Sequence, residues 1–482
     1  MLLDQALILH NQGRLVEAEQ IYNQLLFANP GLIDARHMLG VLKAQQGHNL
    51  EAYDLMAAVA QADPDNGMAL ANFGNVLAAL DRQEDALAAY QRSLILNPDY
   101  PAAWHACGNV LQGLVRYGEA LECYNRFLGF APDHAGAWND RGLALQNLMR
   151  LDEALESFRH AEQLDPSLAY APFNRGLCHL LMGDFASGLP LYEWRKKMPQ
   201  PMEALVCSRP LWTGAEDLGG KTVFTYVEQG LGDAIQYYRY VRFLLDRGAK
   251  VVLSVPDRLR ALLRSMVPAV ELIGRNEEPA EFDFHIPLPS IPLAVGMRLE
   301  TIPTVDRALS AQPARAAHWR ETLGNHGFRI AIAWQGNQLV RGSEGKQFPL
   351  AALVGIGALP GVRLIAVQKG EGTEQLDALP PGMKVERYDF DSGSDAFLDT
   401  AAMITACDLV ITADTAPAHL AGALGVPTWV ALKHVPDWRW FLGRDDSPWY
   451  PSLTLFRQPR TGDWDSVFAR MAGKLAPRLA KG

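Results

Sequence analysis

Two patterns of apolar and polar residues divide the chain near residue 200. In the first, small and large apolar residues recur every 34 residues, and a proline closes each period. Proline cannot donate the backbone hydrogen bond that would extend a helix, so each proline marks a helix end. The pattern predicts a solenoid of about six helical pairs over residues 1–200. The prolines stand at Pro30, Pro64, Pro98, Pro132 and Pro166.

Each 34-residue period also carries two small residues at fixed places. Two antiparallel helices can approach closely only where a side chain is missing, and larger residues such as Tyr90, Trp104 and Phe158 fill the layers around such points. The sixth period departs from the pattern at Pro172 and Gly188, and we expect it to cap the solenoid and to dock the next domain. The small residues are Gly40, Gly74, Gly108, Gly142 and Gly176, and Ala18, Ala52, Ala86, Ala120 and Ala154.

Beyond residue 200, short apolar runs alternate with amphipathic stretches. This order is typical of parallel sheets covered by helices on both faces. It predicts two Rossmann-like α/β halves, over 201–320 and 321–482, and an amphipathic C-terminal helix within 462–482 that crosses back onto the first half. The expected strands are 221–227, 250–255, 329–334, 362–367, 408–413 and 427–432, with helices near 233–247 and 257–266.

Composition and charge exclude several classes of protein. The net charge of −10 argues against a nucleic-acid binder, and five cysteines without CxxC spacing indicate neither a disulfide framework nor a zinc site. No apolar run approaches the roughly 18 residues of a membrane span, and the first residues lack a signal peptide's basic segment, so we expect a cytoplasmic chain. Residues 1–200 hold 14 basic and 23 acidic residues. This acidic region favours a basic or neutral protein partner, although solvated helix faces explain the charge equally well.

Four polar loops follow expected strands, where open α/β sheets bind their ligands. They are residues 227–236, 333–350, 367–372 and 412–425. Any one of them is explained by a tight turn or a helix cap. Together, in two facing halves, they favour a shared cleft.

The 34-residue pattern resembles the tetratricopeptide (TPR) repeat. Such repeats bind partners on a concave surface lined by the first helix of each pair. Polar residues at lining positions can hydrogen-bond an extended peptide, and they resemble the asparagine ladder of O-GlcNAc transferases, although solvation of the groove is the alternative. The expected peptide-binding residues are Asn72, Asn75, Asn109, Asp140 and Asn174.

Residues 221–460 resemble a glycosyltransferase of the GT-B fold, closest to the bacterial family 9 that includes heptosyltransferases. The motifs are LGDAI at 231–235, KQFP at 346–349 and DTAPAHLAGALG at 414–425. A bacterial group in which TPR repeats precede such a domain is closer still, and several flagellin-modifying transferases belong to it. The expected fold class is therefore α plus α/β, a TPR α-solenoid followed by the two Rossmann-like domains of GT-B.

The resemblance implies a site for a nucleotide-sugar donor. A helix beginning after Thr415 would turn the backbone N–H groups of Thr415, Ala416 and Ala418 toward the phosphates. Lys346 would supply the compensating cation, with Arg341 as its alternative. Further expected contacts are Asp414, His419, Gln335, Asn337 and Gln368, each of which could instead serve only its own loop.

The acceptor hydroxyl must lose a proton as it attacks, which requires a base that faces the cleft. Asp233 matches the base aspartate of family 9, and Glu228 in the same loop is the alternative. The resemblance implies inversion by direct displacement with no metal or other cofactor. Asp389 and Asp391 spell the DxD pattern of metal-dependent transferases, but they lie off the main motifs.

The sequence therefore predicts a transferase that moves a sugar from a nucleotide donor to a Ser or Thr hydroxyl of a protein held by the TPR groove. One alternative is a saccharide acceptor. The other is a non-catalytic peptide-binding scaffold, because Ala416 replaces the family's usual glycine. Expected partners are the donor and a protein or peptide, and we expect no nucleic acid and no membrane span. The sugar, the nucleotide base and the acceptor are not determined by the sequence.

Overall fold

The computed structural model describes residues 2–199, 209–266, 268–275, 277–304, 307–337, 345–393 and 396–480. It forms two compact units, Met1–Arg175 and Gly176–Gly482. The sequence analysis places the end of the solenoid domain at residue 200, whereas the compact units divide within the sixth helical pair. The last helix of the repeat region therefore belongs to the same unit as the α/β domain.

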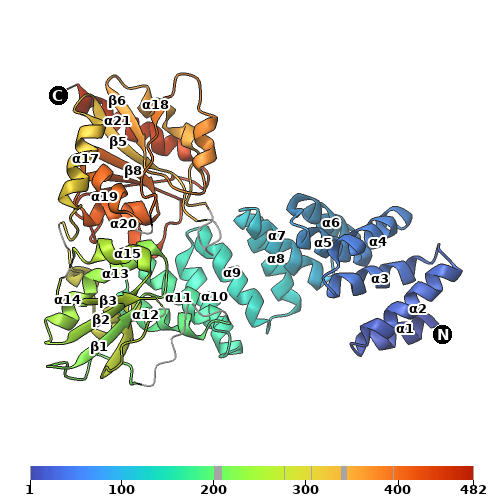
Figure 1. Cartoon of the computed structure of the whole chain (residues 1–482). Coiled ribbons are helices and arrows are strands. Elements are labelled where there is room, and N and C mark those ends of the chain that lie inside the picture. The colour runs from blue at the N-terminus through green and yellow to red at the C-terminus, as the bar shows by residue number, and fades with distance from the viewer. Residues whose placement is uncertain are drawn as a thin grey trace. The chain divides into compact units, whose positions relative to one another are not determined.

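The first unit is a row of antiparallel helical pairs, coloured blue to teal in Figure 1. Its helices start at intervals that repeat the sequence period, with first helices at residues 33, 67, 101 and 135 and second helices at 15, 49, 83, 117 and 151. The bounds are α1 Leu2–Asn11, α2 Leu15–Ala28, α3 Ile33–Gln45, α4 Asn49–Ala62, α5 Gly67–Ala79, α6 Gln83–Leu96, α7 Pro101–Gly113, α8 Tyr117–Phe130, α9 Ala135–Asn147 and α10 Leu151–Leu164. A sixth pair follows, α11 Tyr170–Leu181 and α12 Phe185–Tyr192.

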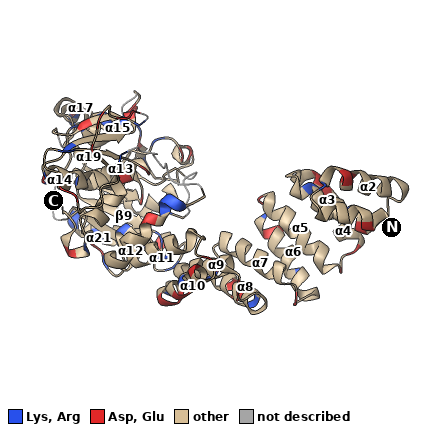
Figure 2. Cartoon of the chain, turned by 90° about the horizontal axis from the view of Figure 1, so that it is seen from below, with Lys and Arg blue, Asp and Glu red and all other residues tan. Residues whose placement is uncertain are grey.

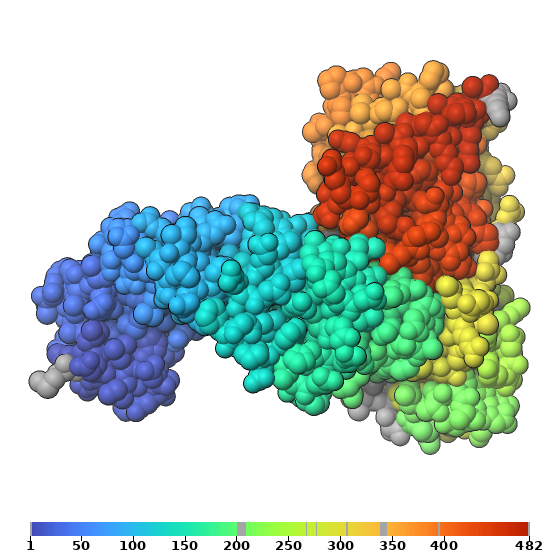
Figure 3. Space-filling view, turned by 180° about the vertical axis from the view of Figure 1, so that it is seen from behind, coloured from blue at the N-terminus to red at the C-terminus, as the bar shows by residue number. Residues whose placement is uncertain are grey.

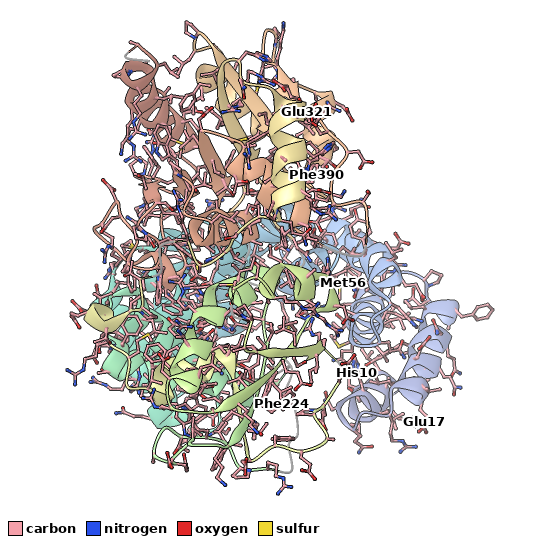
Figure 4. All side chains as sticks on the ribbon, turned by 60° about the vertical axis from the view of Figure 1, so that its left-hand side comes forward. His10, Glu17, Met56, Phe224, Glu321 and Phe390 are labelled. Carbon is pink, nitrogen blue, oxygen red and sulfur yellow. The ribbon has the colours of Figure 1, made fainter. Side chains whose placement is uncertain are left out.

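The small residues mark the points where paired helices cross. A Cβ atom on Gly74 would lie 2.7 Å from the ring of Tyr90, and one on Gly142 would lie 2.5 Å from the ring of Phe158. In the second pair the corresponding neighbour of Gly40 is Met56, labelled in Figure 4, at 3.1 Å. These contacts confirm the prediction that the crossing points cannot accept a side chain.

Both kinds of turn in the repeats have a defined backbone conformation. Second helices end two residues before the repeated proline, since the residue that precedes a proline is driven toward extended geometry. The turn between first and second helices instead uses one left-handed residue, again every 34 residues. These residues are Gly13, Gly47, Asp81, Val115, Met149 and Gly183, with φ between 59° and 85°.

The second unit contains two parallel sheets. The first has the strand order β3-β2-β1-β4. Phe224 of β1, labelled in Figure 4, packs with Tyr226 and Val252 on one face of this sheet. The bounds are β1 Thr222–Tyr226, α13 Leu231–Tyr237, α14 Val241–Leu245, β2 Lys250–Val255, α15 Asp257–Leu263, β3 Glu271–Gly274, β4 Phe284–Pro287 and α16 Ile291–Ala294.

The second sheet has the strand order β10-β9-β8-β5-β6-β7, also parallel. The bounds are α17 Pro313–Leu323, β5 Phe328–Ala333, α18 Val354–Gly357, β6 Val362–Ala366, β7 Val385–Glu386, α19 Leu398–Thr405, β8 Leu409–Ala413, α20 Ala416–Ala423, β9 Thr428–Leu432, β10 Leu453–Arg457 and α21 Trp464–Leu479. On the face shown in Figure 3, the red surface of this half adjoins the yellow and green surface of the first half.

The C-terminal helix corrects one expectation. Val467, Phe468, Met471 and Leu475 of α21 are buried in the core of the second sheet together with Ile330 and Trp429. The helix therefore packs on its own half, where its apolar stripe is fully used, and the expected crossing onto the first half is wrong.

Charged residues are scattered over the helices of the solenoid, as Figure 2 shows. Several form pairs one turn apart along a helix or its cap, such as Arg116 with Glu119 and Arg150 with Glu153. Within the described residues, no helix combines the length and the apolar character needed to cross a membrane.

Candidate functional site

The two halves of the second unit meet where α13 approaches α20. A Cβ atom on Gly232 would lie 3.0 Å from the ring of His419 and 3.2 Å from the Cα atom of Ala416. Both helices begin just beyond the carboxyl ends of parallel strands, β1 and β8, which is where such sheets bind ligands. The two predicted loops 227–236 and 412–425 are therefore neighbours.

A chain of alternating charges crosses this meeting point. Lys346 Nζ lies 2.9 Å from Asp414 Oδ2 and 3.6 Å from Asp437 Oδ2. Arg439 reaches Asp437 Oδ1 at 2.9 Å and Asp233 Oδ1 at 2.6 Å. We call these five residues the ion chain. It joins the loops after β5, β8 and β9 in the second half to α13 in the first.

The charges of the ion chain depend on burial and on the neighbouring ions. Burial raises the pKa of the Asp233 carboxyl, against the opposing effect of Arg439. Burial acts in the same sense on Asp437, but Arg439 and Lys346 outweigh it and hold the pKa of Asp437 well below its ordinary value. Burial opposes the charge of Lys346, yet Asp414 and Asp437 raise the pKa of the ammonium. Of the two carboxyls that Arg439 contacts, Asp233 thus has a raised pKa and Asp437 a lowered one.

The N-terminus of α20 offers fewer free amides than the sequence suggested. The N–H of Thr415 donates to Ala413 O at 2.8 Å, and the N–H of Ala418 donates to Thr415 O at 2.9 Å. Among the described residues no acceptor is found for the N–H of Ala416. An anion at this helix end would thus meet one unpaired amide, at Ala416, rather than three.

His419 lies in the interior. Its ring stacks on Trp440 at a centroid distance of 5.4 Å, and its Nδ1 lies 3.2 Å from the hydroxyl of Tyr450. Burial lowers the pKa of His419 to about 3, so the imidazole is neutral at physiological pH. It can offer a hydrogen bond to a neighbour but no positive charge to a phosphate.

Glu228, the alternative base, belongs to a separate buried network. Its carboxylate accepts from Arg195 Nε at 2.8 Å, and Arg195 also donates to Ser290 Oγ at 2.6 Å. The adjacent Gln229 donates to the hydroxyl of Tyr192 at 2.6 Å. These bonds fasten the loop after β1 to the segment that follows α12. Of the two predicted bases, Asp233 is the one on the ion chain.

The amide side chains near the donor loop have structural partners. Gln368 Oε1 accepts from the N–H groups of Trp334 and Gln335, and its Nε2 donates to Gln335 O and Glu371 O. Gln335 Oε1 accepts from Gln375 at 3.3 Å. Gln368 is thus fully used in joining the loops after β5 and β6. Asn337 lies exposed after β5, and Arg341 falls outside the described residues.

The DxD pattern serves as a helix cap. Asp391 accepts from the N–H groups of Phe397 and Asp399 at 3.1 and 2.7 Å, and from the hydroxyl of Thr400 at 2.5 Å. It therefore caps α19 next to Phe390, which Figure 4 labels. No group of His, Cys, Asp and Glu side chains in the described part of the chain has an arrangement that could hold a metal ion.

The predicted groove residues of the solenoid already have partners within it. Three bonds cross from one repeat to the next: His37 to Asn72 at 3.0 Å, His105 to Asp140 at 3.0 Å and Asn174 to Asn139 at 2.9 Å. Asn75 and Asn109 accept from Tyr90 and Tyr124 of their own repeats, at 2.6 and 2.9 Å. Their paired oxygens fix these amides in place, and the exposed Asn75 and Asn109 remain open to solvent.

Asp437 and Arg439 were missed by the sequence analysis. They lie in a segment after β9 whose tryptophans Trp438, Trp440 and Trp449 are buried. The usable signal was two charged residues on either side of Trp438, just beyond the carboxyl end of a strand. Charges in so apolar a setting need partners, and the ion chain supplies them.

Comparisons with known proteins agree with this division of the chain. Family models for the TPR repeat and the tetratricopeptide repeat match residues 74–115 and 108–169. The model of glycosyltransferase family 9 (heptosyltransferase) matches residues 351–432. That segment contains Gln368, Asp414 and the N-terminus of α20, whereas Asp233, Lys346 and Arg439 lie outside it.

One curated relative and several solved structures are similar to parts of the chain. Protein FlbA of Caulobacter vibrioides is 28% identical over 335 residues, which are 64% of this chain and 55% of that protein. The chain thus spans about half the length of this relative. A crystal structure of MamA matches with 23% identity and a TM-score of 0.32. The match covers 35% of this chain and 92% of the MamA chain.

Another match is a crystal structure of YrrB, described as a TPR protein with an unusual peptide-binding site, with 20% identity and a TM-score of 0.35. This match covers 38% of this chain and 94% of the YrrB chain. The resemblance predicted from the motifs is confirmed by the family models. The chain joins tetratricopeptide repeats to a glycosyltransferase family 9 domain.

Proposed function

We propose that this chain is an inverting, metal-independent glycosyltransferase that moves a sugar from a nucleotide-sugar donor to a Ser or Thr hydroxyl of a protein. The observation that carries the proposal is the ion chain, because it sets two cations and a proton-accepting carboxylate at the carboxyl ends of strands from both sheets. Phosphate binding and proton removal are the two tasks that such a transfer requires.

The donor's phosphates would be bound by the second half. Lys346 presents an ammonium held charged by Asp414 and Asp437, and the unpaired N–H of Ala416 adds the positive end of α20. These groups would stabilise the negative charge that develops on the leaving nucleotide. A metal ion has no necessary part in this scheme.

Asp233 would act as the general base. As the acceptor hydroxyl attacks the anomeric carbon, its proton passes to the Asp233 carboxylate, while the bond between that carbon and the phosphate oxygen breaks. The electron pair of the broken bond leaves with the nucleotide. A single displacement of this kind inverts the anomeric configuration.

The TPR unit would supply the protein acceptor. The bonds between repeats hold Asn72, Asp140 and Asn174 in register along the first helices, and the exposed amides of Asn75 and Asn109 offer hydrogen bonds to an extended peptide. A peptide backbone accepts such bonds whatever its side chains. The groove would thus hold a segment near its modification site.

The proposal is tested with the purified full chain, labelled nucleotide sugars and candidate acceptor proteins. We expect transfer to protein by the native chain and a fall in kcat of roughly 10²–10⁴-fold in Asp233→Asn. Binding of the nucleotide, measured by calorimetry, should survive this change. The matched control is Asp246→Asn, which alters an exposed aspartate in the same half.

Unchanged turnover in Asp233→Asn would remove the base from the scheme. A native chain that binds none of UDP, GDP, ADP and CMP would contradict the donor site and leave a binding scaffold. Transfer to a free saccharide but to no protein would contradict the acceptor class.

A further inference from the structure

Arg439 is the most firmly held member of the ion chain. Its guanidinium carbon lies 4.9 Å from the ring of Trp438 and 5.3 Å from that of Tyr237. Nη1 donates to Asp437 Oδ1 at 2.9 Å, and Nη2 donates to Gln229 Oε1 and to the Tyr237 hydroxyl, both at 3.2 Å. Only 8% of the side chain is exposed, so this cation cannot move without breaking several contacts.

Asp233 is the partner of Arg439 that can be displaced. Its side chain is 26% exposed, against 8% for the guanidinium that it covers. It stands in the first turn of the short helix α13, directly after Gly232, and its other oxygen accepts a hydrogen bond from the N–H of Gly230 at 3.2 Å. A rotation of this one carboxylate would uncover the guanidinium of Arg439.

Two cations lie side by side behind that carboxylate. Lys346 and Arg439 both contact Asp437, on its two oxygens, so they present neighbouring positive charges. The ion chain nevertheless holds three aspartates against two cations. A ligand with two or more negative charges would meet repulsion here unless one carboxylate gives up its cation.

We propose that Arg439 exchanges Asp233 for a phosphate group of the nucleotide donor, and that this exchange frees Asp233 to accept the proton of the acceptor hydroxyl. The inference rests on the proposed function and deepens it by naming a second phosphate-binding cation. It also implies an order of events. Asp233 is held in an ion pair with Arg439 and becomes available as the base once the donor is in place.

The exchange is tested by calorimetry on the full chain with UDP, GDP and ADP and with inorganic pyrophosphate as probes. Removing the competing carboxylate in Asp233→Asn should tighten binding of the best nucleoside diphosphate by about tenfold. Removing the cation in Arg439→Gln should weaken it by roughly 10–100-fold, the usual effect of losing a charge-assisted hydrogen bond. Arg439→Lys should lie between the native chain and Arg439→Gln.

The matched control is Arg329→Gln. Arg329 forms an ion pair with Asp408 at 3.1 Å at the start of β5, whereas the ion chain lies beyond the carboxyl ends of the strands of the same sheet. This change should leave nucleotide affinity at the native value. Circular dichroism and thermal unfolding establish whether each variant is folded.

Native affinity in folded Arg439→Gln would overturn the exchange and leave the proposed function standing. Should that variant fail to fold, Asp233→Asn decides, since unchanged or weaker binding contradicts competition for Arg439. A native chain that binds neither nucleotide nor pyrophosphate would overturn the exchange and the donor site together. Tighter binding of pyrophosphate alone in Asp233→Asn would place the exchange at the phosphates without a nucleotide and contradict the donor assignment.

Discussion

At the scale of single residues, His419 owes its protonation state to burial. The imidazole is enclosed by Trp440, Tyr450 and α13, and burial lowers its pKa to about 3. The unfolded chain would protonate this histidine near pH 6.5. Between these two values the unfolded state binds one more proton than the folded state, so stability must fall as the pH falls.

We expect His419→Gln to reduce the acid sensitivity of the fold. Lowering the pH from 7 to 5 should reduce the free energy of unfolding of the native chain by about 2 kcal/mol through this residue. The variant should not show this part of the reduction. The measurement is denaturant unfolding followed by tryptophan fluorescence at both pH values. His48→Gln, which changes an exposed histidine of the solenoid, should keep the native difference. Equal pH dependence in the native chain and His419→Gln would show that burial does not lower the pKa of His419.

At the scale of elements, the turns inside the repeats combine a strict backbone with a varied sequence. Every described turn between first and second helices uses a left-handed residue, but three of the six positions hold a side chain. Val115, between α7 and α8, has φ 64°. A left-handed conformation is most strained for a β-branched residue. The residue is 47% exposed, so burial offsets little of this strain.

Val115→Gly should therefore stabilise the solenoid by about 1 kcal/mol, because glycine adopts the left-handed conformation without strain. Thermal unfolding of the full chain measures the effect as a rise in Tm. The contrasting variant is Val16→Gly, which places glycine at an exposed position within α2 and should cost about 0.5 kcal/mol. Destabilisation by both changes to the same extent would mean that the turn is not strained.

The sequence predicted the internal strands of both sheets but not the strands at their edges, because the two groups differ in length and burial. The six expected strands are β1, β2, β5, β6, β8 and β9, and all are central or nearly so, with long apolar runs. β3, β4, β7 and β10 escaped prediction. β3 and β7 lie at sheet edges and are only partly buried, and β7 has two residues, Val385 and Glu386. Short, half-buried strands carry too little apolar pattern to stand out.

At the scale of the whole molecule, the proposed function assigns acceptor binding and sugar transfer to different parts of the chain. The first five helical pairs and the α/β domain fall into different compact units, and the ion chain lies entirely within the second. A change in the groove should thus alter the use of the protein acceptor while nucleotide binding stays at the native level.

We expect the double variant Asn75→Ala, Asn109→Ala to raise KM for a protein acceptor by roughly tenfold, through lost hydrogen bonds to the peptide. Nucleotide affinity, measured by calorimetry, should remain native. Glu156→Ala, an exposed change on α10, is the control. A native KM in the double variant would exclude these two amides from acceptor binding, and a loss of nucleotide affinity would contradict the separation of the units.

The sequence by itself determined the repeat length, the close contacts at Gly74 and Gly142, and the central strands, because these follow from local periodicity and from the room that a side chain needs. It also singled out Asp233, Lys346 and Asp414 as candidates. Only the tertiary structure decided that these three belong to one ion chain, that Asp437 and Arg439 complete it, and that Glu228 is bound to Arg195. Pairing of charges depends on which residues distant in sequence become neighbours, and no local pattern carries that information.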